Sequence, residues 1–167
     1  MNPDQLVPSC YPCDQQATGA LPPREDVVRT DHWRVAHAFN SMLPGWLVLL
    51  PTGHVTSVTD LTPEAADELG GLIRRLSTAL EAVTGCVKTY FMQFSEAEGF
   101  SHLHVHLVPR MRDHPRDAIG PASFAYLTDD ESRWLGETDR DSIALSIRAA
   151  LAASSRDQGG AGQPDSP

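Results

Sequence analysis

Three histidines, His102, His104 and His106, alternate with the apolar residues Leu103 and Val105. Side chains at every second position of a β-strand point to the same face, so a strand here would present three imidazoles on one side and apolar side chains on the other. Neutral imidazoles are common zinc ligands. They can also act as nucleophiles, with neighbouring groups that stabilise the developing charge. The row therefore predicts a metal site, a site of nucleophilic catalysis, or a row in which these roles are divided among the three histidines.

The residues that follow the row disfavour a site in which all three imidazoles bind a catalytic metal. Metal sites of that type commonly add a carboxylate shortly after the histidines. In this chain the first carboxylate after the row is Asp113. We therefore favour a nucleophilic histidine, with two alternatives: the metalloenzyme, and a zinc-stabilised interaction domain in which all three histidines are structural.

A cysteine pair, Cys10-x-x-Cys13, lies near the N-terminus. A thioredoxin-like redox motif would follow a strand and open a helix, but the preceding residues do not predict a strand. Zinc sites often combine such a pair with two distant ligands. The pair therefore indicates zinc, with two free cysteines as the alternative. Cys86 is predicted to be a small buried apolar residue.

The elements that must position these residues are short strands and one long helix. Alternating or β-branched sequence predicts strands at 27–28, 33–39, 46–50, 87–94 and 102–108. Thr62 as N-cap, Pro63 at the first helical position and Gly85 after the end delimit a long helix with an apolar stripe. A short helix is expected at 143–151. This order predicts an α+β fold with an antiparallel sheet of about five strands.

The length of 167 residues predicts one domain, which we place at 1–153. Residues 1–23 read as an arm that something must pin down, and 154–167 as a disordered tail. A formal net charge of −9 argues against a broad nucleic-acid surface. No run is long and apolar enough to span a membrane, and the N-terminus does not read as a secretory signal. We expect a cytoplasmic protein with a small-molecule ligand.

The histidine row and its surroundings resemble the signature of the histidine-triad (HIT) superfamily. The row continues to Pro109-Arg110, as is common in that family. Upstream, 44–54 resembles the family's Gly-x-x-Leu-φ-φ-Pro-x-x-His segment, and 58–64 resembles the start of its long helix. The resemblance covers about residues 10–112. It implies a HIT-like fold and a homodimer.

The resemblance also implies roles for individual residues. His104 would attack the α-phosphorus of a nucleotide and form a covalent nucleotidyl-histidine. His106 would contact the phosphate and help to bind the leaving group. The zinc-bearing branch of the superfamily implies a structural zinc site that pins the arm to the histidine strand; no organic cofactor is expected. Its four ligands would be Cys10, Cys13, His54 and His102.

The implied activity is hydrolysis or transfer at the α-phosphate of a nucleoside phosphoramidate, a dinucleoside polyphosphate or a related nucleotide conjugate. The alternatives are a nucleotide phosphorylase or nucleotidyltransferase, and a nucleotide-binding module with little turnover. The loop 95–101 lacks the Gly-Gln-Ser of many members, so Ser95 or Ser101 would supply donors to the phosphate. Asn40 is the nearest candidate for the ribose-binding position, and Gln93 lies near a position where relatives often have asparagine.

Overall fold

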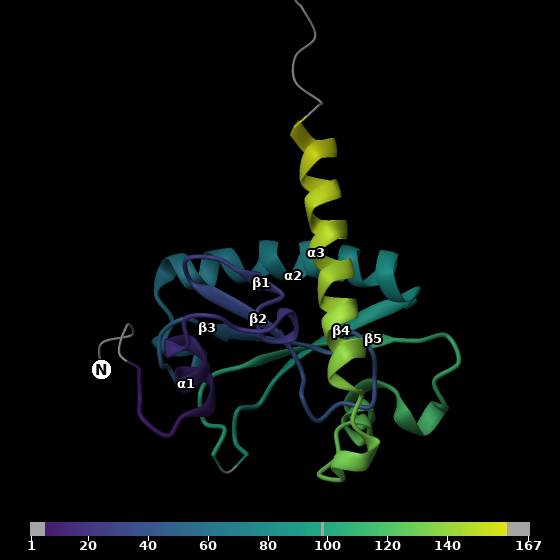
Figure 1. Cartoon of the computed structure of the whole chain (residues 1–167), viewed down its shortest axis with the longest axis horizontal. Helices are drawn as coiled ribbons and strands as arrows, with labels where there is room; N and C mark the ends of the chain where they lie inside the picture. Colours follow the sequence, from purple (N-terminus) through teal and green to yellow (C-terminus); the bar gives the residue numbers. More distant parts are fainter. Residues whose placement is uncertain (1–5, 98, 160–167) are drawn as a thin grey trace, which may run out of the picture.

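The chain folds around one five-stranded antiparallel sheet, described here from a computed structural model that covers residues 6–97 and 99–159 (Figure 1). In sequence order the strands are β1 (Val28–Arg29), β2 (Trp33–His37), β3 (Leu47–Pro51), β4 (Lys88–Gln93) and β5 (Val105–Arg110). Their order in the sheet is β1-β2-β3-β5-β4, which makes β1 and β4 the edges. The predicted α+β class and antiparallel sheet of about five strands are confirmed.

The long helix α2 (Pro63–Thr84) has the boundaries that its capping residues predict. The Thr62 hydroxyl accepts a hydrogen bond from the Ala65 N–H at 3.2 Å, which satisfies one of the free donors of the first turn. Gly85 follows the last turn with φ of 69°, a left-handed conformation that glycine adopts without steric cost. The capping residues Thr62 and Gly85 therefore set the two ends of this helix.

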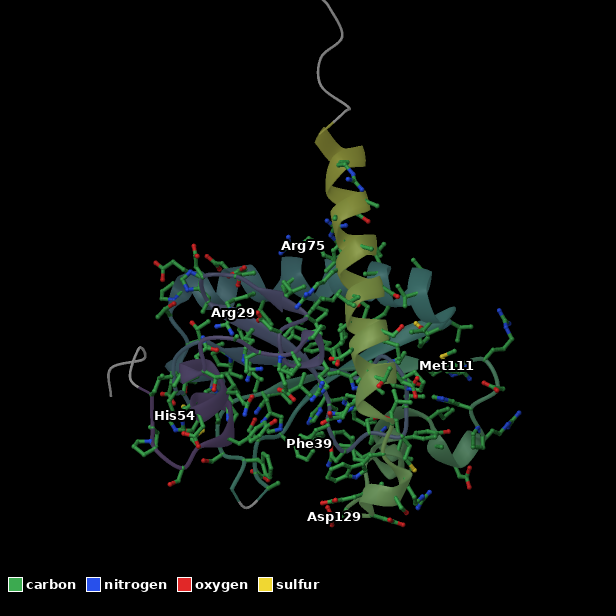
Figure 2. All side chains as sticks on the ribbon, viewed as in Figure 1. Arg29, Phe39, His54, Arg75, Met111 and Asp129 are labelled. Atoms are coloured by element: carbon green, nitrogen blue, oxygen red, sulfur yellow. The ribbon has the colours of Figure 1, made fainter. Side chains whose placement is uncertain are left out.

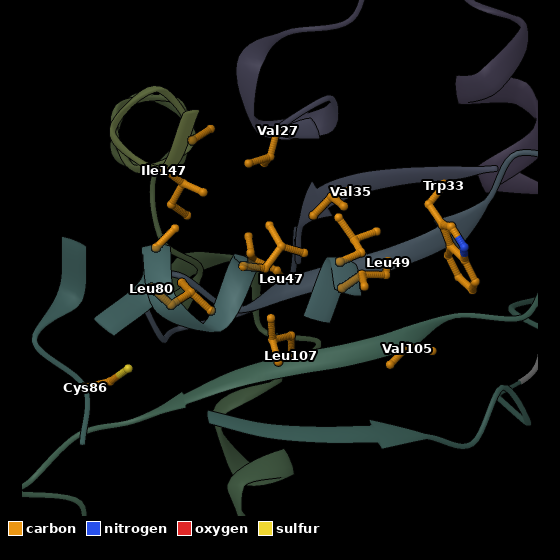
Figure 3. Packing of buried hydrophobic residues seen from close by; sticks show 14 residues of the cluster. Val27, Trp33, Val35, Leu47, Leu49, Leu80, Cys86, Val105, Leu107 and Ile147 are labelled. Atoms are coloured by element: carbon orange, nitrogen blue, oxygen red, sulfur yellow. The ribbon is translucent and has the colours of Figure 1, made fainter. Parts of the chain in front are cut away.

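One face of the sheet packs against helices and is fully apolar (Figure 3). Side chains alternate along each strand, so every second residue of β3 and β5 enters this core. The buried cluster comprises Val27, Trp33, Val35, Leu47, Leu49, Leu72, Leu76, Ala79, Leu80, Cys86, Val105, Leu107, Ala144 and Ile147. The opposite face carries the histidines together with a second, smaller apolar cluster of Ala38, Leu43, Trp46 and Val108.

The C-terminal helix α3 (Glu137–Gly159) is longer than predicted. It packs on α2 and, in Figure 1, extends past it at its C-terminal end. Residues 154–159, predicted to belong to a disordered tail, are thus helical; 160–167 lie outside the described residues. The extension follows from the run Ala149-Ala150-Leu151-Ala152-Ala153, which has high helix propensity and carries the helix beyond its packed part.

Two further predictions need correction. The expected N-terminal arm contains a short helix, α1 (Tyr11–Ala17), with Pro12 and Cys13 buried. The regular pairing of β5 starts at Val105, so His102 and His104 lie in the segment that leads into the strand.

Short 3₁₀ helices connect the main elements: η1 (Pro23–Glu25), η2 (Val58–Asp60), η3 (Arg116–Ala118), η4 (Gly120–Tyr126) and η5 (Glu131–Arg133). The segment that carries η4 and η5 is bound to the turn before β3. The N–H of Met42 donates to the Tyr126 carbonyl at 2.9 Å, and the N–H of Leu135 donates to the Ser41 carbonyl at 2.9 Å. Among the described residues, no helix has the length and apolar character that crossing a membrane requires.

Candidate active site

A cavity of about 570 Å³ opens on the face of the sheet that carries the histidines. All three residues of the row line it, as the alternating pattern predicts. Aromatic side chains make up much of the remaining wall: Tyr11, Phe39, Phe94, Phe100, Phe124 and Trp134. Figure 2 shows the labelled Phe39 and Asp129, both cavity residues, on the side of the sheet away from α2. The cavity is large enough for a small organic ligand.

The backbone selects one tautomer of the neutral His104 ring. Its Nδ1 lies 2.8 Å from the carbonyl oxygen of His102. A carbonyl only accepts hydrogen bonds, so Nδ1 carries the proton of the neutral ring and Nε2 is left with a free lone pair. A half-buried His104 therefore offers a nucleophilic nitrogen to the cavity.

His106 lies beside His104 and is almost fully buried. The two rings are perpendicular, with their centroids 4.9 Å apart. The indole Nε1–H of Trp46 donates to His106 Nδ1 at 3.1 Å. Burial, helped by the positive charge that His104 can carry, lowers the pKa of His106 to about 3. His106 is therefore neutral at physiological pH.

Ser95, predicted to contact a nucleotide, lines the cavity and contacts His104, whereas Gln93, also predicted to contact a nucleotide, is not among the described lining residues and contacts Ser95 instead. The hydroxyl of Ser95 accepts from the His104 N–H at 3.0 Å and from the Gln93 side-chain amide at 2.9 Å. Ser95 adopts a positive φ of 55°, which is strained for a residue other than glycine. Asn40 lines the cavity, whereas Ser101 is exposed and is not among the residues that line it.

The four predicted metal ligands come together at one end of the histidine row. Their ligand atoms all lie within 4.8 Å of one another. Cys10 Sγ is 3.5 Å from His102 Nδ1, and Cys13 Sγ is 3.4 Å from His54 Nδ1. Zinc bonds of about 2.3 Å to sulfur and 2.1 Å to nitrogen place neighbouring tetrahedral ligands about 3.6 Å apart. The cluster therefore fits a tetrahedral zinc ion, with no position left for a substrate.

The orientation of His102 agrees with this metal site. Its Nε2 lies 3.2 Å from the Pro51 carbonyl, so Nε2 carries the proton and Nδ1 points its lone pair at the cysteines. Burial lowers the pKa of His102 to about 4, which keeps the ring neutral, as a ligand must be. Burial also raises the pKa of the Cys10 thiol to about 11, and a bound cation would reverse that effect.

Comparison with known proteins assigns the family. A family model described as the HIT domain matches residues 22–113, which is more than half of the chain. The chain belongs to the HIT family. The match includes the whole histidine row and leaves the cysteine pair and the segment after 113 outside it.

Solved structures of HIT proteins share the fold. A zinc-bound histidine triad family protein from Mycobacterium smegmatis has a TM-score of 0.65 at 20% identity, covering 89% of this chain and 97% of that one. A Hit-like protein involved in cell-cycle regulation from Bartonella henselae has a TM-score of 0.67 at 19% identity, covering 87% and 99%. A hypothetical histidine triad nucleotide-binding protein from Sulfolobus tokodaii has a TM-score of 0.66 at 13% identity, covering 95% and 100%.

Two residues of this HIT site had no clear signal in the sequence. Trp46 is the first residue of the nearly all-apolar strand predicted at 46–50, yet it is the hydrogen-bond partner of His106. His37, which the sequence predicts as a packed or surface residue, is packed, and no sequence signal indicated that it lines the cavity and accepts a hydrogen bond from the Gly45 N–H at 3.0 Å. The alternation of β2 places His37 on the sheet, but only the tertiary structure shows what it contacts.

The charge of the HIT cavity is unusual for a site that would bind phosphate. None of the described residues that line it is a lysine or an arginine, and three are carboxylates: Glu25, Glu96 and Asp129. Glu25 is buried and lies 3.6 Å from the guanidinium of Arg34, which compensates its charge. Glu96 and Asp129 are exposed and are in none of the ion pairs found among the described residues.

Proposed function

We propose that this protein hydrolyses or transfers nucleotidyl groups through a covalent intermediate on His104. The observation that carries this proposal is the hydrogen bond from His104 Nδ1 to the His102 carbonyl, which leaves the Nε2 lone pair for attack. Membership of the HIT family, neutral His106 beside the nucleophile and a cavity of suitable size support it.

The reaction would proceed in two displacements at phosphorus. In the first, His104 Nε2 forms a bond to the α-phosphorus while the bond to the leaving group breaks, and the leaving group keeps the electron pair and takes up a proton from solvent water. In the second, water attacks the phosphorus and releases one proton to solvent, which restores the proton used in the first step, while the bond to His104 breaks and the nucleotide leaves. Splitting the reaction in this way avoids direct attack by water on the substrate. In a phosphorylase or nucleotidyltransferase, phosphate or another acceptor would replace the water.

The four-residue metal cluster would hold a structural zinc ion in this scheme. Cys10, Cys13, His54 and His102 fill its coordination, so the ion takes no part in the displacement and braces the segment on which His104 lies. His102 connects the two parts, because its side chain belongs to the cluster and its carbonyl accepts from His104.

The charge of the cavity ranks two of the three candidate substrate classes. A dinucleoside polyphosphate carries several negative charges and would meet the exposed carboxylates of Glu96 and Asp129 without a lysine or arginine among the described lining residues. A nucleoside phosphoramidate carries one negative charge and an amine leaving group. We therefore expect the phosphoramidate to have the higher kcat/KM, by about tenfold for each ~1.4 kcal/mol of repulsion avoided.

Intact-protein mass spectrometry tests the proposal. The protein would be incubated with adenylated and guanylated substrates of each class and quenched without acid, because phosphohistidine bonds are acid-labile. A nucleotide-sized mass gain on the wild type, absent from His104→Ala, is the expected result. His32→Ala, a histidine outside the cavity, is the matched control and should retain the gain.

Two results would contradict this assignment. Turnover that survives in His104→Ala would exclude His104 as the nucleophile. Nucleotide binding without adduct or turnover across the panel would identify a binding module instead. Repeating the reaction with and without inorganic phosphate would separate a hydrolase from a phosphorylase, since only the latter consumes phosphate.

We also propose that the protein is a cytoplasmic homodimer. Strand β4 is an edge of the sheet, and Phe91 at its centre is 63% exposed. An exposed apolar edge strand is a natural surface for pairing with a second copy. Light scattering should give a dimer for the wild type and a monomer for Phe91→Asp. Leu145→Asp, at a similarly exposed apolar residue on α3, should leave the dimer intact.

A further inference from the structure

Trp46 is the residue that decides which nitrogen of His106 carries the proton. Its indole Nε1 lies 3.1 Å from His106 Nδ1. An indole nitrogen only donates, so His106 Nδ1 must be an unprotonated acceptor. A neutral imidazole with a bare Nδ1 carries its proton on Nε2. His106 is therefore held in the tautomer opposite to that of His104, whose proton is on Nδ1.

The two tautomers give adjacent rings complementary chemistry. His104 offers a lone pair at Nε2, and His106 offers an N–H at Nε2. A phosphate oxygen is an acceptor, so it gains a hydrogen bond from an Nε2–H and would be repelled by a lone pair at the same position. The tautomer of His106 thus determines whether this ring helps or hinders the binding of a phosphate next to the nucleophile.

The surroundings of Trp46 make its donor a fixed feature. Trp46 is fully buried, and its ring packs edge-on against Phe124 with centroids 5.5 Å apart. The preceding Gly45 has φ of 82°, and a Cβ there would lie 3.0 Å from Leu80 and Thr84, so the turn that places Trp46 requires glycine. The Gly45 N–H is in turn bound by His37 at 3.0 Å.

His106 itself has little freedom to turn away from this partner. It is 8% exposed and packs edge-on against Phe124, with ring centroids 5.0 Å apart. Its register partner across the sheet is Val48, two residues after Trp46 on the chain. The hydrogen bond lies in a dry interior, where an unpaired indole N–H or imidazole nitrogen would be costly.

We propose that Trp46 is a positioning residue whose indole N–H holds the proton of His106 on Nε2, so that this ring donates to the phosphate of the substrate. The proposal rests on the proposed function for the identity of the substrate. The tautomer that Trp46 imposes is a property of the free protein. It can therefore be measured without any substrate.

Nitrogen NMR on the ¹⁵N-labelled, zinc-loaded protein tests the proposal directly. In the wild type, we expect His106 to show a protonated Nε2 and a bare Nδ1, with a scalar coupling across the hydrogen bond between Trp46 Nε1 and His106 Nδ1. In Trp46→Phe, which keeps an aromatic ring and loses the donor, a population with the proton on Nδ1 should appear. A protonated Nδ1 in the wild type, or an unchanged tautomer in Trp46→Phe, would overturn the proposal.

Trp33→Phe is a matched control for the loss of a buried indole. Trp33 is also fully buried, and its Nε1–H donates to the Ala65 carbonyl at 2.9 Å, on the helix-covered face of the sheet. Both variants lose one aromatic donor, so both should lose comparable stability. Only Trp46→Phe should change the His106 tautomer and lower kcat/KM, by about tenfold for a loss of ~1.4 kcal/mol at the transition state.

The two measurements separate this proposal from the proposed function. If the tautomer shifts in Trp46→Phe while the wild type forms no adduct with any nucleotide, Trp46 controls His106 as proposed and the nucleotidyl transfer is wrong. If the adduct forms and Trp46→Phe reacts as fast as Trp33→Phe, the nucleophile stands and the positioning role of Trp46 is overturned. The wild-type coupling decides the point even if Trp46→Phe does not fold.

Discussion

The two ends of the histidine row use the same side chain for different purposes. At the metal end, His102 joins Cys10, Cys13 and His54 in a cluster that a tetrahedral ion would fill. At the cavity end, His104 and His106 face an open space of about 570 Å³. The neighbours make the difference: thiols surround the first imidazole, and a backbone carbonyl and an indole fix the other two.

The comparison shows that proton placement, more than residue type, assigns the roles. His102 donates from Nε2 and turns Nδ1 to the cluster, whereas His104 donates from Nδ1 and turns Nε2 to the cavity. Both acceptors are backbone carbonyls, of Pro51 and His102. Two backbone carbonyls therefore orient two histidines that are two positions apart in the chain in opposite ways, one toward the cysteines and one toward the cavity.

The largest effect should come from breaking the metal end. Cys13→Ser removes a zinc ligand, and the free energy of unfolding should fall by several kcal/mol, because binding of a structural ion contributes directly to folding. Activity should fall too, since the His102 segment that holds His104 loses its brace. Urea unfolding, zinc content and adduct formation would be measured on the same samples.

Cys86→Ser is the matched control for that variant. Cys86 is also buried but belongs to the apolar core and not to the metal cluster. It should keep full zinc content and lose only about 1–2 kcal/mol for a buried hydroxyl. Equal losses in the two cysteine variants, with unchanged zinc, would show that the metal end has no role in stability.

A smaller effect should come from lowering the pH, which protonates the buried histidines that line the cavity. Burial lowers the pKa of His37 from 6.5 to about 4. Between pH 6.5 and about pH 4, His37 is protonated in the unfolded chain but stays neutral in the folded protein. The free energy of unfolding therefore falls as the pH falls through this window. The loss is about 1.4 kcal/mol per pH unit, or about 2 kcal/mol at pH 5. His106 should contribute a similar loss of unfolding free energy at low pH, since its pKa is also lowered, to about 3.

His37→Gln makes that prediction testable. The glutamine cannot titrate, so the difference in unfolding free energy between pH 7 and pH 5 should be about 2 kcal/mol smaller than in the wild type. His32→Gln, outside the cavity, should keep the wild-type difference. An unchanged pH dependence in His37→Gln would mean that His37 is not held neutral by burial.

The smallest effect should come from removing the hydrogen bond that the His104 N–H donates to the Ser95 hydroxyl. Ser95→Ala and Ser95→Gly both remove the hydroxyl that accepts from the His104 N–H, so kcat should fall by a similar factor in the two variants. Their stabilities should differ, because only glycine tolerates the φ of 55°; we expect Ser95→Gly to be about 1 kcal/mol more stable.

Ser101→Ala controls for the loss of a hydroxyl in the same loop. Ser101 is exposed and away from the cavity wall, so neither kcat nor stability should change. If the two Ser95 variants differed in kcat as much as in stability, backbone strain and not the hydroxyl would be the relevant property.

Local sequence predicted most of the fold. The presence of strands β2 and β5 and the limits of α2 at Thr62 and Gly85 depend on residues close together in the chain, and these predictions are confirmed, although β5 begins three residues later than predicted. The helix α1 was not predicted, because its seven residues lack an apolar period and only Pro12 and Cys13 among them are buried, Cys13 as a member of the cysteine–histidine cluster. The predicted end of α3 was also wrong, because the high helix propensity of the sequence extends the helix beyond the part that packs on the core.

The site was predictable where it depends on alternation and not where it depends on distant neighbours. The metal set and the histidine row were named from motifs and family resemblance, and the structure brings each group together. The partnership of Trp46 with His106 requires the β3–β5 register, which no local pattern encodes. The cavity wall from the η4–η5 segment depends likewise on its hydrogen bonds to the turn before β3.

The metal cluster also has a consequence for the order in which the chain folds. Cys13 and His102 are 89 positions apart, and closing a loop of that length costs about 4 kcal/mol of chain entropy. The pairing of β3 with β5 brings the segments that carry His54 and His102 side by side, so we expect an ion to be captured once these strands have paired. If His104 is the nucleophile that we propose, zinc uptake would then mark the moment at which a newly made chain becomes competent.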